Sequence, residues 1–376
     1  MRKLLKFVAV VVVGLVVGLA AFGYREWGRL NEPYKGYPAT EQFVDIPPGT
    51  TVAGIGRRLA ETGVVRDTVI FRVALWRSGR PPRLKAGEYR FSEPSTAAAV
   101  IDRLARGDVY TRRITFPEGL TIAEMAKLYA SRGFGLAADF SRAAKDASAI
   151  VDLDPQAPDL EGYLFPETYA LARGTPASSL VRTMVDRFKA VFGSQLRRRA
   201  EQEGLTVRQA VTMAALIEKE TGQEEERTLV AAVYRNRLKI GMPMQADPTL
   251  IYALEKAGRY DGNIRKTDFD FASPYNTYRY PGLPPGPIAA PGKASLTAAL
   301  NPADVRYLYF VSRNDHTHVF AETLAKHNAN VRKFQVQYFR QQRLGPQSGG
   351  RGQGEGGRAV PGNRHQSQGG SSGKGR

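Results

Sequence analysis

Two carboxylates stand at the end of a stretch of the chain that is otherwise almost wholly apolar. Residues 207 to 221 read VRQAVTMAALIEKET, and the two acids are Glu218 and Glu220. A carboxylic acid on an apolar surface keeps its proton more readily than one in water, so it can serve as a general acid. The pattern indicates a proton donor, and the alternative is that EKET is a solvated helix end.

Helix signals frame this stretch. Thr206 is followed three positions later by Gln209, which is a capping-box pattern, and helix formers continue until Thr221-Gly222 ends the run. Val211, Ala214 and Glu218 then share one face of the predicted helix.

Within that helix the two acids point in different directions. Glu220 is turned away from Glu218 by about 200°, because the helix repeats every 3.6 residues. Apolar surroundings and the negative end of the helix dipole both disfavour the ionised form of Glu218, and Lys219 partly opposes them. Glu218 is therefore the expected acid.

Length and composition limit the class of protein. With 376 residues, of which 42% are hydrophobic, the chain can form two or three domains with real cores. Cysteine is absent, which excludes a disulfide framework, a thiol nucleophile and a thiolate metal site.

The N-terminus predicts a single membrane anchor. Residues 1–24 hold a basic tip and then an apolar run, and Leu4 to Tyr24 is close to the ~20 residues that cross a bilayer. The basic tip should remain in the cytoplasm, so the bulk of the chain would be periplasmic. The alternative is a cleaved signal peptide with a weak site at Gly18-Leu19-Ala20.

Export changes the meaning of the net charge of +18. Nucleic acid is not an expected partner outside the inner membrane, and anionic lipids and wall polymers are. Residues 25–42 form a polar linker, and residues 341–376 form a tail rich in Gly, Ser, Gln and Arg that is expected to be disordered.

A repeat follows the linker. VDIPPGTTVAGIGRRLAETGVV begins at Val44, and the similar ITFPEGLTIAEMAKLYASRGF begins at Ile114. Each copy predicts a short strand, a Pro-x-Gly turn, a capping Thr and a helix that ends at Gly. The identical pairs are Pro47/Pro117, Gly49/Gly119, Thr51/Thr121, Ala53/Ala123, Ala60/Ala130 and Gly63/Gly133.

The first copy continues into a predicted strand at 84–91 and a helix at 96–107. Small αβ units of this kind resemble LysM modules, which bind glycans that contain N-acetylglucosamine. We therefore assign 43–140 as a LysM-like region, and the alternative is a structural spacer.

Five later segments carry a more specific resemblance. They are LEGYLFPETYAL (160 to 171), AALIEKET (214 to 221), VYRNRLKIGMPMQADPTLIYAL (233 to 254), SPYNTYRYPGLPPGPIAAPG (273 to 292) and RYLYFVSRNDHTHVF (306 to 320). In this order they resemble the YceG-like endolytic murein transglycosylases, the MltG family, from the anchor to about Phe334.

The resemblance implies an inner-membrane protein whose catalytic domain, here 141–340, cleaves nascent peptidoglycan strands internally. It implies 1,6-anhydro-N-acetylmuramic acid ends, no cofactor, and association with peptidoglycan synthases. It also implies that the essential glutamate is the first Glu of EKET, Glu218. One acid can be enough, because the sugar's own C6 hydroxyl replaces the water of ordinary glycosidases.

The remaining site candidates are polar groups that could hold sugar rings. Asp247 could instead cap the helix predicted after it, and the Pro-rich loop GLPPGPIAAPG is the expected wall of the cleft. The substrate-binding candidates are Gln245, Asp247, Tyr275, Asn276, Thr277, Tyr278, Glu161 and Glu220.

A metal site is the less favoured reading of the histidines. His316 and His318 alternate on a predicted strand and are followed by Glu322 and His327. Their spacing matches no standard zinc motif, so we predict no metal and favour polar residues that line or brace the cleft.

The predicted fold class is α+β: a single transmembrane helix, LysM-like αβ units and a mixed catalytic domain with an open groove. Two other functions remain open. A muramidase would need a second carboxylate, for which Glu161 and Glu220 are candidates, and a silent scaffold would only bind glycan.

Overall fold

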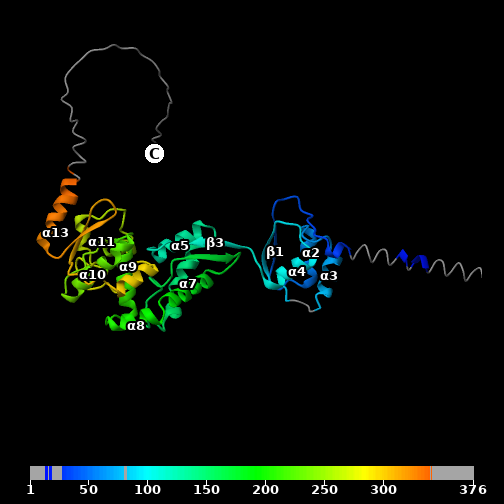
Figure 1. The fold of residues 1–376 in the computed structure, drawn as a ribbon, viewed down its shortest axis with the longest axis horizontal. Helices are drawn as coiled ribbons and strands as arrows, with labels where there is room; N and C mark the ends of the chain where they lie inside the picture. Colours follow the sequence, from blue (N-terminus) through cyan, green and yellow to red (C-terminus); the bar gives the residue numbers. More distant parts are fainter. Residues whose placement is uncertain (1–12, 16, 19–27, 80–82, 339, 341–376) are drawn as a thin grey trace, which may run out of the picture.

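The computed structural model describes residues 13–15, 17–18, 28–79, 83–338 and 340 (Figure 1). Most of the expected anchor, Leu4 to Tyr24, and the whole tail 341–376 lie outside these residues. Among the helices that the structure describes, none has the length and apolar character needed to cross a membrane.

A first hydrophobic core gathers buried residues from Leu30 to Leu104, and we call this part of the chain the N-terminal unit. β1 and β2 pair antiparallel, with Val44 opposite Tyr89, and their buried side chains meet the helices. The strand and helix predicted at 84–91 and 96–107 are confirmed as β2 and α4. The elements are β1 (Gln42–Ile46), α2 (Val52–Glu61), α3 (Thr68–Arg77), β2 (Gly87–Phe91) and α4 (Ala97–Arg106).

A second core gathers buried residues from Ile114 to Leu300, and we call this part the main body. Its strands form two antiparallel pairs along the described chain, β3 with β4 and β5 with β6. Small sheets among many helices make the fold mixed α+β, as predicted. The elements begin with β3 (Thr111–Thr115), α5 (Ile122–Ser131), α6 (Ala137–Ala144), η1 (Ala147–Ile150), β4 (Thr168–Ala172), α7 (Ala177–Val191), α8 (Ser194–Gln202) and α9 (Val207–Glu220). They continue with η2 (Glu224–Glu226), α10 (Arg227–Lys239), α11 (Asp247–Lys256), η3 (Lys266–Asp270), α12 (Lys293–Leu300), β5 (Tyr309–Ser312), β6 (His318–Ala321), α13 (Leu324–Val331) and the π-helix η4 (Arg332–Gln337).

The two repeat copies have the predicted local structure. Thr51 caps α2 and Thr121 caps α5, each by accepting a backbone N–H three residues on. The copies nevertheless belong to different cores: α2 packs in the N-terminal unit, whereas Met125 of α5 is buried in the main body. The second copy thus shares its core with the elements that follow it.

The helix predicted at the EKET stretch is confirmed as α9. Thr206 and Gln209 form the predicted capping box, and Thr221 is the C-cap. The helix is buried from Ala210 to Ile217, because α10, α11 and α12 pack around it. The Pro-rich segment 282–292 forms neither helix nor strand, as expected, and it leads into α12.

A buried ion pair fixes the start of α9. Arg208 donates two hydrogen bonds of 2.8 Å to Asp154, and the Tyr163 hydroxyl donates a third of 2.5 Å. Burial alone would raise the pKa of Asp154, but the hydrogen bonds from Arg208 and Tyr163 outweigh it and hold the pKa below its usual value. The loop before the LEGY segment is thereby tied to α9.

We expect Asp154→Ala to lower the free energy of unfolding by about 3 kcal/mol, because it leaves Arg208 without its buried partner. Since the folded-state pKa of Asp154 is depressed, its contribution is present above about pH 4 and is lost as pH falls below that. Urea unfolding at pH 7 and at acidic pH measures both effects. The control is Asp152→Ala, which breaks an exposed pair with Lys189 and should cost less than about 1 kcal/mol. Equal losses of unfolding free energy in the two variants would contradict the conclusion that the pair of Asp154 and Arg208 stabilises the start of α9.

Candidate active site

Glu220 reaches a cavity of about 410 Å³ in the main body. This volume is in the range of ordinary ligand sites. The end of α9, α10, the segment before α11 and the hairpin of β5 and β6 supply its walls. It is lined by Glu220, Arg237, Met244, Gln245, Asp247, Tyr278, Phe310, Val311, Ser312, His318 and His327.

The environment of Glu220 favours a protonated carboxyl. Burial raises the pKa of Glu220, a hydrogen bond of 2.6 Å from the Tyr234 hydroxyl opposes the rise, and the negative charge of Asp247 adds to it. A carboxyl that lines a cavity and whose pKa is raised by burial has the properties expected of a general acid.

Asp247 and Gln245 present polar groups to the same cavity, and both are exposed to solvent. The Tyr278 hydroxyl donates a short hydrogen bond to Asp247. Asp247 makes no side-chain cap to α11, although it occupies the first position of that helix. The alternative role of Asp247 as an N-cap is therefore wrong, and its carboxylate remains available to the cavity.

Thr277 holds this part of the wall together. Its hydroxyl accepts the Ala246 N–H at 3.1 Å and lies 2.8 Å from the Thr249 hydroxyl, and its carbonyl accepts the Gln245 N–H at 3.2 Å. Gln245 has a φ of 49°, in the left-handed region that non-glycine residues rarely adopt. The buried threonines thus fix a segment that would otherwise relax.

Asn276 is buried and uses its side chain within the protein. Its amide nitrogen donates 2.9 Å bonds to the Phe269 and Phe271 carbonyls, and its oxygen accepts the Tyr278 N–H. Of the four YNTY residues, Tyr278 lines the cavity with Glu220, whereas Asn276 and Thr277 shape the loop that carries it.

Glu161 belongs to a different cavity, of about 270 Å³, and Tyr275 packs against Tyr252, which also lines that cavity. Glu161 lines it and accepts the Ile122 N–H at 3.0 Å and the Tyr252 hydroxyl at 3.2 Å. Burial raises the pKa of Glu161 to about 7. The Tyr275 ring packs on that of Tyr252, with centroids 4.9 Å apart. Neither residue lines the cavity of Glu220.

Glu218 faces a different part of the protein from Glu220. Its carboxylate accepts the Gly292 N–H at 3.0 Å and lies 4.0 Å from the Arg227 guanidinium. Its side chain is 8% exposed, and it lines none of the cavities described here. The predicted divergence of the two acids along α9 is thus visible in their different partners.

Glu118 stands near Glu218 and had no predicted role. Burial raises the pKa of Glu118, the charge of Glu218 raises it further, and Arg227 opposes both. Its carboxylate packs so close to Gly292 that a Cβ there would require the Glu118 side chain to move. The sequence contains one indication that Glu118 has a special role: the equivalent turn position in the first repeat copy is Pro48, which carries no charge.

Arg237 and the pair of Glu226 and His318 were also not predicted. Arg237 donates to the Leu308 carbonyl at 2.7 Å and to the Met244 carbonyl at 2.5 Å, so it joins β5 to the Gln245 segment. The Glu226 carboxylate accepts the backbone N–H of His318 at 2.7 Å and lies 2.7 Å from Nδ1 of the same histidine. The signal for Arg237 is a charged residue on an otherwise buried stripe of α10.

The histidines do not gather a metal set. In the part of the chain that the structure describes, no three His, Cys, Asp or Glu side chains lie close enough together to hold an ion. His318 begins β6, but His316 lies in the turn before it with a φ of 69°, so the prediction that both alternate on one strand is wrong. The turn interrupts the strand because Asp315 binds Thr317 locally.

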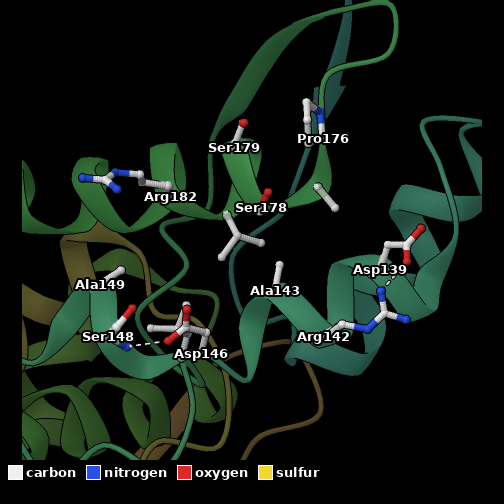
Figure 2. A pocket seen from close by; sticks show the side chains of 13 residues that line it. Asp139, Arg142, Ala143, Asp146, Ser148, Ala149, Pro176, Ser178, Ser179 and Arg182 are labelled. Carbon is white, nitrogen blue, oxygen red and sulfur yellow. Dashed lines mark hydrogen bonds and ion pairs between the residues drawn. The ribbon is translucent and has the colours of Figure 1, made fainter.

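The largest of the described cavities, about 760 Å³, lies between α6, η1 and the start of α7 (Figure 2). Two pairs of its polar groups bind one another: Arg142 donates to Asp139, and the Ser148 N–H donates to Asp146. Both of its carboxylates are engaged in these contacts, so its size alone does not make it a reaction site.

The model of the YceG-like family matches residues 44–333. An endolytic murein transglycosylase of Bacillus subtilis is 31% identical over 336 residues, which cover 85% of this chain and 91% of that protein. One of Streptococcus pneumoniae is 29% identical, and the match covers 77% of this chain but 57% of the longer relative. A crystal structure of a yceG-like protein from Listeria monocytogenes aligns with a TM-score of 0.53 and 30% identity. That alignment covers 77% of this chain and 98% of the other.

We expect Thr277→Val to lower the free energy of unfolding by about 1–3 kcal/mol, because it leaves the buried Ala246 N–H without its acceptor. The substitution keeps the shape of the side chain, so packing loss contributes little. Urea unfolding measures the effect, and Thr297→Val on the exposed face of α12 is the matched control, with a change within about 0.5 kcal/mol. Similar losses of unfolding free energy in both variants would show that the Thr277 hydroxyl does not stabilise this wall of the cavity.

Proposed function

The chain belongs to the YceG-like family, and on that premise we propose that it is an endolytic murein transglycosylase whose proton donor is Glu220. The activity follows from relatives of that name at 29–31% identity over most of the chain. The choice of Glu220 is carried by one observation: of the two EKET acids, Glu220 lines the cavity that Asp247 and Tyr278 also line. Glu218 stays a prediction from the family resemblance, and the same experiment tests it.

The first step is proton transfer to the bond between N-acetylmuramic acid and N-acetylglucosamine. Glu220 gives its proton to the glycosidic oxygen, the bond from that oxygen to C1 of the muramic acid breaks, and the glucosamine leaves with a free hydroxyl. Burial of Glu220 supports this step, because it raises the pKa and so favours the protonated form that can donate.

The second step uses the ionised Glu220 as a base. It takes the proton of the C6 hydroxyl, whose oxygen closes on C1 and leaves a 1,6-anhydro end. Positive charge develops at C1 between the steps, and the exposed Asp247 carboxylate is suited to stabilise it. Tyr234 supports the ionised intermediate, since its hydroxyl already donates to the Glu220 carboxylate.

A hydrolase remains the second candidate, because Asp247 gives the cavity a second carboxylate. A water held by Asp247 would attack C1 and leave a reducing end, which is the chemistry of a muramidase. Glu161 is less suited to that role, because it lines the other cavity. The two reactions differ in their products, so the end formed on the muramic acid distinguishes them.

We also propose the location and the partners. The apolar run from Leu4 to Tyr24 would hold the chain in the inner membrane with its bulk in the periplasm, and the N-terminal unit would bind glycan as a LysM-like module. An open groove around Glu220 would accept the middle of a strand, so that cleavage ends elongation. Peptidoglycan synthases are the expected partners.

We expect Glu220→Gln to lower the rate of strand cleavage by about 10²- to 10⁴-fold, because glutamine cannot donate the proton. Glu218→Gln should stay within about tenfold of the parent, since its amide oxygen can still accept the Gly292 N–H. Mass spectrometry of uncrosslinked glycan strands incubated with the purified chain measures the anhydro ends.

Other patterns have definite meanings. Loss of activity in Glu218→Gln alone would identify Glu218 as the proton donor. Reducing ends would establish the muramidase, and intact strands with the parent and both variants would favour a glycan-binding scaffold.

Tyr234→Phe should move the alkaline limb of the pH profile to higher pH. The acid must be protonated to react, so activity is lost as pH rises through the pKa of Glu220. The Tyr234 hydroxyl favours the ionised form, and its removal raises that pKa further. The rate against pH measures the shift, and Tyr280→Phe at the exposed surface is the control. A limb that stays in place would show that Glu220 does not set it.

A further inference from the structure

An exposed apolar stripe runs along α3 of the N-terminal unit. Val69 is 64% exposed, Val73 is 38% exposed and Trp76 is 83% exposed. Residues three and four apart share one face of a helix, so the three side chains form one surface. Ile70 and Phe71 on the other face are buried in the core of the unit.

The charged residues of α3 itself have one sign. α3 carries Arg72 and Arg77 and no acidic residue, and Arg72 is exposed beside the stripe. The nearest acid before the helix, Asp67, uses its side chain to cap the Ile70 N–H at 2.8 Å. An apolar face with tryptophan and flanking arginines matches the headgroup region of an anionic bilayer, where aromatic rings and basic side chains are both favoured.

The position of α3 agrees with such a surface. Arg77 at its end donates to Asn31 at 3.4 Å, and Arg66 just before it pairs with Glu32 at 2.8 Å. The chain therefore enters the N-terminal unit beside α3, as Figure 1 shows. Even when fully extended, the chain from Tyr24 to Gly28 spans at most about 14 Å. A unit anchored through Leu4 to Tyr24 would keep α3 close to the bilayer.

We propose that the Val69, Val73 and Trp76 face of α3 docks on the surface of an anionic phospholipid bilayer. The inference rests on the inner-membrane location proposed above. Docking fixes the orientation of the N-terminal unit on the membrane, so that the α3 face of the unit lies against the bilayer. The main body is then presented at a limited height above the place where strands emerge.

The experiment uses the full chain with Trp27→Phe, which leaves Trp76 as the single tryptophan of the sequence. The chain is reconstituted into vesicles of phosphatidylglycerol and phosphatidylethanolamine whose acyl chains carry bromine near the headgroup or near the bilayer centre. Trp76 emission should be blue-shifted and quenched, more strongly by the shallow bromines, because an interfacial helix sits about 5–10 Å into the boundary. Aqueous iodide should quench it weakly.

Variants separate docking from folding. Val69 is mostly exposed, so Val69→Asp places a charge in the stripe without burying it, and it should abolish quenching by brominated lipid. Val69→Leu keeps the stripe apolar and should preserve the quenching. Circular dichroism checks that both fold. Vesicles of phosphatidylcholine alone should give weaker quenching, because the arginines then lose their anionic partners.

Three outcomes would overturn the proposal. Strong iodide quenching without bromine quenching would leave the stripe in water, and protection from both quenchers would place a protein, such as a second copy, on it. If the chain does not sediment with the vesicles, both the membrane anchor and the docking surface are contradicted. Anhydro ends in the same samples report the enzymatic activity separately, so failure of docking and failure of the proposed function can be told apart.

Discussion

The burial of α9 is the constraint on which the rest of the structure depends. From Ala210 to Ile217 the helix is surrounded by protein, and small side chains such as Ala214 and Ala215 let α12 approach it closely. A helix that enters the core in this way must have its polar ends satisfied. At the start, the capping box and the Arg208 pair with Asp154 do this. At the end, the Thr221 hydroxyl donates to Glu226, which in turn binds His318, so the β5–β6 hairpin is attached to the helix that carries the acids.

One helix end thereby supplies two carboxylates with different environments. Glu218 accepts a backbone N–H of the loop before α12 and lies 4.0 Å from the Arg227 guanidinium. Glu220 has a single strong hydrogen bond, from Tyr234, and a carboxylate neighbour in Asp247. The helical period separates the two side chains, and the packing of α10 and the β5–β6 hairpin decides that the hollow lies on the side of Glu220.

Local sequence signals predicted much of this fold and only part of the site. The capping boxes, the repeat and the irregular Pro-rich segment are recorded within a few neighbouring residues, so they could be read without a structure. The side on which a cavity forms depends on β5 and β6, about a hundred residues after α9, and no local pattern contains it. The helix α3 escaped prediction for a related reason: its buried Ile70 and Phe71 and its exposed Val69 and Trp76 are all apolar, so the sequence shows no polar face.

The repeat shows how the same local unit can take on a different role when its surroundings change. In the first copy the turn at Pro48 stays at the surface, and the helix after it packs only within the N-terminal unit. In the second copy the turn joins the main body: Gly119 donates to Ala290, Ala290 donates to Leu120, and Lys219 of α9 donates to the Gly119 carbonyl. The backbone of the turn therefore braces the loop that Glu218 also binds. α9 supplies both the Lys219 brace and the Glu220 that lines the cavity. The local motif that the two units share therefore supports the candidate active site in the main body alone.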